Sequence, residues 1–203
     1  MIARFLEEWL GRWPPASPRD VVASGLRDEP GWDGIVRPAQ GVADAEGRWV
    51  VSVSPSLAGR DDPLSGLHLF EGVFRFSEAP ASLEPAGQWV PAADACVPEW
   101  LRPFGHDVLV ALDDDGRYLA GVGVKRHLPS GWELSVGTDE RARGRGLARR
   151  LVAAAGRYAL DHGAVPLYLH ADDNVASAKA ADAAGFADLG WRVLGIADEN
   201  GET

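Results

Sequence analysis

The sequence predicts an α+β (mixed α/β) fold, in which a mixed sheet carries helices on its faces. The chain has 203 residues, of which 46% are hydrophobic and 25% charged, as in an ordinary soluble globular protein. That length is enough to bury a core without disulfides or metal ions. In the second half, the apolar patterns follow the order strand, strand, strand, helix, strand, helix, strand.

The first half begins with an amphipathic helix over residues 1–13. Glu7 and Glu8 interrupt its apolar run and no small-residue cleavage site follows, so the segment is not a signal peptide. A proline-rich stretch at 13–18 follows, and strand-like runs occupy 34–43, 48–54 and 70–76. We expect the helix to dock on the protein's own core through residues at helical spacing, which are Ile2, Phe5, Leu6, Trp9, Leu10 and Trp13.

Turn residues delimit the elements of the second half. The acidic turn at 113–116 ends in Gly116 and separates two apolar strands, so it predicts a hairpin rather than a metal site. Helices are predicted from Gly144 to about residue 160 and over 174–184, with Gly163 and Gly185 as terminators. The predicted strands cover 108–112, 118–124, 132–136 and 167–170, with a last extended segment at 186–196.

Composition excludes several classes of function. The net charge of −10 disfavours nonspecific nucleic-acid binding, which needs a basic surface. No stretch approaches the roughly 20 apolar residues of a membrane span. The single cysteine, Cys96, excludes an intrachain disulfide and a cysteine-cluster zinc site, and we expect it to be a buried small hydrophobe. We therefore expect a cytoplasmic protein with no metal, and the excess of arginine over lysine suggests a GC-rich bacterial genome.

The informative stretch is a short loop between a strand ending at Val136 and a helix beginning at paired glycines, Gly144 and Gly146. The first amides of a helix have no intrahelical partner, and the helix dipole reinforces their attraction for anions. Residues 141–157 contain six arginines and no acid, so this window carries +6 while the rest of the chain carries −16. A polyphosphate ligand is indicated. The loop lacks the lysine and hydroxyl of an NTPase loop and the spacing of a dinucleotide-binding loop.

At this point the sequence resembles the GNAT superfamily of acyl-CoA-dependent N-acetyltransferases. Arg141-x-x-Gly144-x-Gly146 is similar to the acyl-CoA-binding motif of that family, and Asn174 followed by Gly185-Phe186 is similar to its second helix. The resemblance covers about residues 105–196. It implies a GNAT-like domain at 86–203, with a mostly antiparallel sheet flanked by helices. Residues 1–85 would be an N-terminal α/β extension that packs on the core and shapes the acceptor pocket.

The resemblance also implies a donor site. The backbone of Val136 would pair with pantetheine, and the Leu134 amide would bind the thioester carbonyl. Asn174 and Ser177 would contact the pantetheine arm. The pyrophosphate and the 3′-phosphate would lie on the loop residues Arg141, Ala142, Arg143, Gly144, Arg145, Gly146 and Leu147, together with Arg149.

The acid and the base are less evident. Many family members carry a tyrosine four residues before the glycine that ends the second helix, and this position holds Ala181. Tyr168 on the preceding strand could protonate the leaving thiolate instead, although a thiolate with a pKa near 8.5 can leave unaided. For the base we favour Glu133 or His170, and His127 is a further candidate; each is also an ordinary strand-end or turn residue.

Taken together, the resemblance implies an acetyltransferase (acyltransferase) that passes the acetyl group of acetyl-CoA directly to a primary amine. The acceptor would be a small molecule or a peptide, and the protein a monomer or homodimer with no nucleic-acid or membrane partner. The absent tyrosine leaves open a non-catalytic acyl-CoA-binding module that regulates a partner. A structural protein with a vestigial motif is a third possibility, but a self-repulsive arginine cluster has no evident purpose there.

Overall fold

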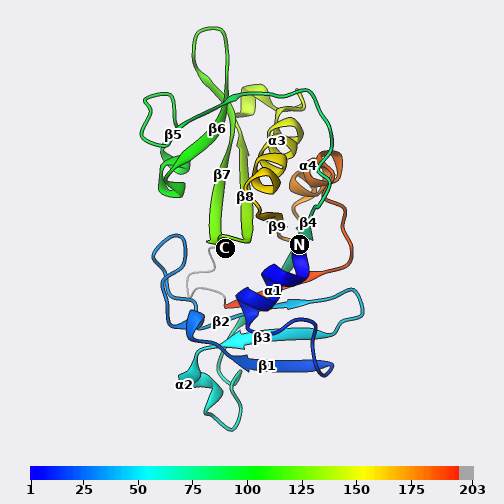
Figure 1. Cartoon of the computed structure of the whole chain (residues 1–203). Coiled ribbons are helices and arrows are strands. Elements are labelled where there is room, and N and C mark those ends of the chain that lie inside the picture. The colour runs from blue at the N-terminus through cyan, green and yellow to red at the C-terminus, as the bar shows by residue number, and fades with distance from the viewer. Residues whose placement is uncertain (197–203) are drawn as a thin grey trace. The chain divides into compact units, whose positions relative to one another are not determined.

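The computed structural model describes residues 1–196 and divides into two compact units (Figure 1). The first unit consists of Met1–Phe74, Leu169–Asp173 and the residues from Asp188 onward. The second unit consists of Arg75–Tyr168 and Asn174–Ala187. Each unit combines a β-sheet with helices, which confirms the predicted α+β class.

The sheet of the second unit has the strand order β9-β8-β7-β6-β5. Neighbouring strands are antiparallel except β8 and β9, which run parallel, so the sheet is mixed and mostly antiparallel as predicted. The last two residues of β9 belong to the first unit. The strands are β5 (Gln88–Pro91), β6 (Asp107–Leu112), β7 (Tyr118–Leu128), β8 (Gly131–Thr138) and β9 (Val165–His170).

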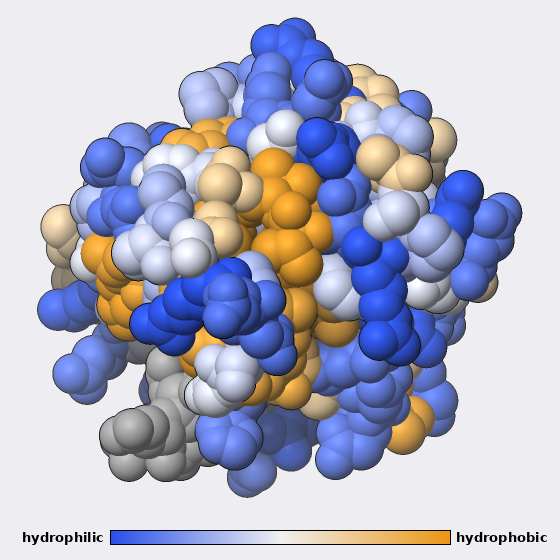
Figure 2. Space-filling model, turned by 90° about the horizontal axis from the view of Figure 1, so that it is seen from below, coloured by the Kyte–Doolittle hydropathy of each residue, from blue (hydrophilic) through white to orange (hydrophobic). Residues whose placement is uncertain are grey.

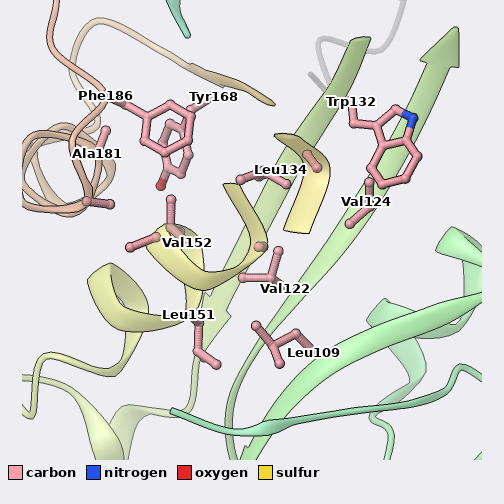
Figure 3. Packing of buried hydrophobic residues seen from close by; sticks show 14 of the residues in the cluster. Leu109, Val122, Val124, Trp132, Leu134, Leu151, Val152, Tyr168, Ala181 and Phe186 are labelled. Carbon is pink, nitrogen blue, oxygen red and sulfur yellow. The ribbon is translucent and has the colours of Figure 1, made fainter. Parts of the chain in front are cut away.

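Helices α3 (Leu147–Asp161) and α4 (Val175–Ala184) pack on one face of this sheet. Figure 3 shows their side chains meeting those of the strands in the main core. The other face is covered by the 3-10 helix η2 (Glu99–Phe104), which approaches closely because β7 has glycine there. A Cβ atom on Gly123 would lie 2.4 Å from the Phe104 ring, so only glycine permits this packing.

Three arginines tie the segment before β5 to the helices of the second unit. Arg75, which is 4% exposed, forms an ion pair with Asp182. Arg157 donates to the carbonyl of Ala81, and Arg150 donates to the carbonyls at residues 84 and 85 at 2.8 and 2.9 Å. Residues 75–85 therefore belong to the second unit, whereas the sequence placed the boundary after residue 85. These contacts span up to 107 positions, so no local pattern could show them.

The first unit is assembled from both ends of the chain. Its strand order is β1-β3-β2-β10-β4, and only β1 and β3 are parallel among its described pairs. The C-terminal strand β10 lies between β2 and β4, so the last extended segment of the sequence completes the N-terminal sheet. The strands are β1 (Arg19–Ala23), β2 (Ala39–Ala43), β3 (Trp49–Val53), β4 (Leu69–Phe76, ending in the second unit) and β10 (Arg192–Ile196).

Helix α1 (Ile2–Leu10) confirms the predicted N-terminal helix. It buries Phe5, Leu6, Trp9 and Leu10 and ends at Gly11 in a left-handed conformation, φ 83°. The buried Arg27 donates to the Trp9 carbonyl at 2.8 Å and to Gln40 at 3.0 Å, and burial lowers its pKa to about 10. A separate apolar cluster packs around β3, against the short helix α2 (Pro55–Ala58).

The strands that the sequence missed are short and lack alternation. β1 has a mainly exposed pattern, and β5 consists of four residues ending in proline. Exposed large hydrophobic residues are most common in the first unit among the described residues, and Figure 2 shows a hydrophobic band bordered by charged residues on the surface seen from below. None of the described helices is long and apolar enough to cross a membrane.

Candidate active site

The strands β8 and β9 are paired over a short stretch. Their parallel ladder ends at the pair Glu133–Leu167 in the described part of the chain, while β8 continues to Thr138. From Leu134 onward, β8 therefore extends beyond the ladder. Unpaired backbone groups at a sheet edge can hydrogen-bond to an extended ligand. This is the place where the sequence predicts the thioester at Leu134 and pantetheine at Val136.

The glycine-rich loop lies directly before α3. Gly144 and Gly146 have left-handed φ angles of 76° and 73°, which favour glycine. Gly146 is the N-cap, no side chain among the described residues caps the helix, and its first turn has no acid. A Cβ on Gly144 would meet nothing within 4 Å, so the space beside it is open. Exposed amides at an uncapped helix start suit a pyrophosphate.

The six arginines in residues 141–157 have different partners in the structure. Arg150 and Arg157 hold the segment at 81–85, as described above. Arg141 donates to the Tyr118 carbonyl at 2.9 Å and pairs with Asp139, and Arg143 lies 3.4 Å from Glu140. The neighbouring acids and the structural arginines therefore reduce the +6 that the sequence assigned to a phosphate site.

Arg145 and Arg149 are the arginines best suited to a phosphate. Both side chains are exposed, and the described contacts give neither an ion pair. A Cβ on Gly146 would lie 3.0 Å from the Arg149 Nε, which places this guanidinium beside the loop.

Helix α4 begins at Asn174, whose side-chain oxygen accepts the N–H of Ser177 at 3.0 Å. This is an N-cap, so Asn174 has a structural role, and its contact with pantetheine remains a prediction. The helix ends at Gly185 with φ 87°, and a Cβ there would lie 2.6 Å from the Ala81 amide nitrogen. The Gly-Phe ending is thus required by backbone conformation and close packing.

Tyr168 lies in the core between the sheet and the helices. Its ring packs against Phe186 with centroids 6.1 Å apart (Figure 3), and Ala181 belongs to the same buried cluster. Tyr168 is 2% exposed and Ala181 is fully buried. Burial raises the pKa of the Tyr168 hydroxyl, and Ser177 and the charge of Arg75 partly oppose the rise. The Tyr168 hydroxyl therefore holds its proton at neutral pH.

Glu133 lies at the last pair of the β8–β9 ladder, and both of its carboxylate oxygens have a described partner. Its Oε1 accepts from Lys125 Nζ at 2.7 Å, and its Oε2 lies 2.8 Å from His127 Nε2. Burial would raise the pKa of this carboxyl, but His127 and Lys125 outweigh burial and lower it to about 2. A carboxylate with such a pKa is a weak proton acceptor, which favours a positioning role over that of the base.

The other residues that the sequence singles out lie at separate places in the fold. Leu134 is 2% exposed, with its side chain in the core on the α3 face, opposite to that of Glu133. His170 ends β9 in the first unit, where its Nδ1 lies 2.8 Å from the Ala171 carbonyl oxygen. Cys96 is half-buried rather than buried, and burial and Asp94 raise the pKa of its thiol.

Sequence reasoning missed the association of Lys125, His127 and Glu133. Lys125 lies opposite Glu133 only because of the register in which β7 and β8 pair, and the sequence alone does not give that register. Within residues 1–196, no group of three or more histidine, cysteine or acidic side chains could hold a metal ion.

A model of the acetyltransferase (GNAT) family matches residues 74–186. The match covers more than half of the chain, and we conclude that the chain belongs to this family. It begins within β4 and includes the divergent strands, the glycine-rich loop and α4. The N-terminal part of the first unit lies outside it. A search of curated proteins gave no match.

Among the solved structures to which the chain is similar, one has a TM-score above 0.5 and supports the fold. A GNAT-family acetyltransferase from Novosphingobium aromaticivorans is 22% identical, with a TM-score of 0.51 over 64% of this chain and 66% of that chain. One from Colwellia psychrerythraea is 18% identical, with a TM-score of 0.49 over 64% and 56%. A GCN5-related N-acetyltransferase from Kribbella flavida is 20% identical, with a TM-score of 0.49 over 77% and 71%. The chain thus spans less than two thirds of the length of the first two proteins.

Proposed function

We propose that this protein transfers an acetyl (acyl) group from acetyl-CoA to a primary amine by direct attack. The observation that carries the proposal is the junction of β8, the glycine-rich loop and α3. There a strand that has left its parallel partner leads into an uncapped helix start with open space beside Gly144. Such a junction offers backbone groups for an amide-containing arm and an anion site for phosphates.

The donor would be held mainly by backbone groups. Val136 would pair with pantetheine, and the amides of the loop at 141–147 would bind the pyrophosphate. Arg145 and Arg149 would pair with phosphate oxygens, since charge-assisted hydrogen bonds of this kind are among the strongest in proteins. Asn174 and Ser177 would lie along the arm at the start of α4.

The chemical step needs a polarised carbonyl, a proton acceptor for the amine and a stable leaving group. The Leu134 amide would donate to the carbonyl oxygen. Tyr168 would supply a proton to the thiolate in place of the tyrosine that position 181 lacks. Supporting this role, Tyr168 belongs to the same buried cluster as Ala181 and stays protonated at neutral pH. The acceptor would be a small amine or a peptide amine.

Isothermal titration of acetyl-CoA and CoA tests the donor site, with Gly144→Trp as the variant. We expect this variant to weaken binding by at least about 100-fold, because an indole would fill the open space beside the loop. Gly116→Trp is a matched control, since Gly116 has the same φ of 76° and also no neighbour for a Cβ within 4 Å. Equal affinity in both variants, or no binding to the unaltered protein, would contradict the proposal.

Ala181 gives a second candidate function some support, namely an acyl-CoA-binding module without catalysis. The two functions predict the same donor binding and differ in turnover. Release of free CoA from acetyl-CoA, followed over a broad panel of primary amines, separates them. Binding with no amine-dependent release would favour the regulatory module.

A further inference from the structure

The carboxylate of Glu133 has a defined partner on each oxygen. Lys125 holds one oxygen and His127 the other, at 2.7 and 2.8 Å, and the Glu133 side chain is 8% exposed. A buried carboxylate that holds an imidazole by one nitrogen fixes the orientation of the ring. The geometry is that of an oriented base, in which the imidazole rather than the carboxylate exchanges protons.

A β-bulge lies at His127. The register of β7 against β8 shifts between Arg126 and Leu128, so His127 is the additional residue. Bulges re-aim a side chain and are frequent next to active sites. The His127 side chain is 13% exposed, compared with 8% for Glu133, so of the two it is the more open to solvent.

The packed core restricts the direction from which an acceptor amine can reach Leu134, where β8 extends beyond its ladder with β9. On the α3 face, the space is filled by fully or almost fully buried side chains, including Leu134, Tyr168 and Ala181 (Figure 3). Glu133 points to the opposite face of β8, because neighbouring residues on a strand alternate. Lys125 and Glu133 are paired residues, so the ionic cluster lies on the face of β8 opposite to α3, the face on which η2 also packs.

We infer that His127 is the general base that deprotonates the acceptor amine and that Glu133 is the positioning residue that orients it. This inference rests on the proposed acetyl transfer. The amine nitrogen forms a bond to the acetyl carbon while the bond from that carbon to sulfur breaks. The proton of the amine passes to His127, and the CoA sulfur leaves as a thiolate or takes the proton of Tyr168.

The described charged groups beside His127 in the second unit come from two strands. Lys125 contributes from β7 and Glu133 from β8, and η2 packs on the same face through the rings of Trp100 and Phe104. Arg126 is on the other face, where its guanidinium lies 4.6 Å from the centre of the Trp132 ring. Glu133 is therefore the described carboxylate that orients this imidazole.

The test compares two small nucleophiles in the CoA-release assay, ethylamine and hydroxylamine. Ethylamine is almost wholly protonated at neutral pH and needs a base, whereas hydroxylamine is largely unprotonated. We expect His127→Gln to slow transfer to ethylamine by about 100-fold or more and transfer to hydroxylamine by less than about 10-fold. His106→Asn, at an exposed histidine of the same unit, is the control and should leave both rates unchanged.

Glu133→Gln provides a second measurement that a purely structural role would not move. It keeps the shape of the side chain and removes the charge that holds the imidazole, so it should slow transfer to ethylamine more than transfer to hydroxylamine. CoA titration on each variant separates this inference from the proposed function, because donor binding should persist. Equal losses with both nucleophiles in a folded, CoA-binding His127→Gln protein would overturn the inference. Equal losses with both nucleophiles in Glu133→Gln would also overturn it.

Discussion

The two units differ in how far apart in the sequence their neighbouring strands are. In the second unit, β5, β6, β7 and β8 are consecutive in sequence and pair as neighbours. In the first unit, β1 pairs with β3 in parallel, and β10 joins β2 and β4 from the other end of the chain. Two strands that follow each other in the sequence are joined by a turn whose residues can be recognised, whereas the pairing of strands far apart in the sequence has no such local pattern. Sequence reasoning was accordingly clearer for the second unit.

The units also differ in what lies in them. The second unit contains nearly all of the residues matched by the family model, and the ionic cluster around Glu133. The first unit contains a cavity of about 420 Å³ with an apolar lining that includes Trp49, Leu64 and Leu194, and Glu71 and Arg192 at its polar side. None of these lining residues belongs to the matched segment. The proposed donor site thus lies in the second unit, and the following predictions test that division.

The largest effect is expected from emptying each core in turn. Phe74 and Phe186 are both fully buried, one in each unit. Each phenylalanine-to-alanine change should lower the free energy of unfolding by about 3–5 kcal/mol, because a cavity adds to the lost burial. Phe186→Ala should also reduce CoA binding, whereas Phe74→Ala should leave the CoA affinity of the folded protein unchanged. Urea denaturation measures the change in stability, and calorimetric titration measures the change in CoA affinity. An equal loss of CoA affinity in the two variants would contradict the assignment of the donor site to the second unit.

A pH effect on stability should come from Glu133. Its pKa is lowered from 4.5 to about 2 in the folded protein, so its contribution is present above pH 4.5. That contribution is lost as the pH falls from about 4.5 through about 2, and it is on the order of 3 kcal/mol. Urea denaturation as a function of pH measures it. Glu133→Gln should flatten this part of the curve, and an unchanged slope would contradict the ion-pair assignment.

The division of the arginines predicts a smaller effect on binding. Arg149→Ala should weaken CoA binding by about 10-fold, the equivalent of about 1.4 kcal/mol, and leave the melting temperature unchanged. Arg157→Ala should do the opposite, because Arg157 holds the segment at 81–85. Titration and thermal denaturation of both variants measure this. A loss of affinity in Arg157→Ala alone would reverse the assignment.

The smallest effect concerns two helix caps, one in each unit. Ser54 accepts the N–H of Leu57 and Asn174 accepts that of Ser177. Replacement of either by alanine should lower the free energy of unfolding by about 1 kcal/mol. If Asn174 also contacts pantetheine, Asn174→Ala should lower CoA affinity as well, while Ser54→Ala should not. Identical affinities would limit Asn174 to capping.

The sequence by itself determined the class of fold, the order of elements from β6 to β10 and the place of the glycine-rich loop. These features depend on local patterns: alternation along strands, helical spacing of apolar residues, and glycines where φ is positive. Gly144, Gly146 and Gly185 could be identified because a left-handed backbone conformation restricts the residue type at that position alone.

The tertiary structure alone decided which arginines hold other parts of the chain, which unit contains residues 75–85, and which side chains hold Glu133. Arg75 and Asp182 are 107 positions apart, and Lys125 meets Glu133 only through the register of β7 and β8. The pKa of a carboxylate depends on the charges within a few ångströms of it, and those neighbours are set by strand pairing rather than by its own sequence context. For that reason the sequence offers Glu133 as a candidate base, whereas the positioning role that we infer for it depends on its partners in the structure.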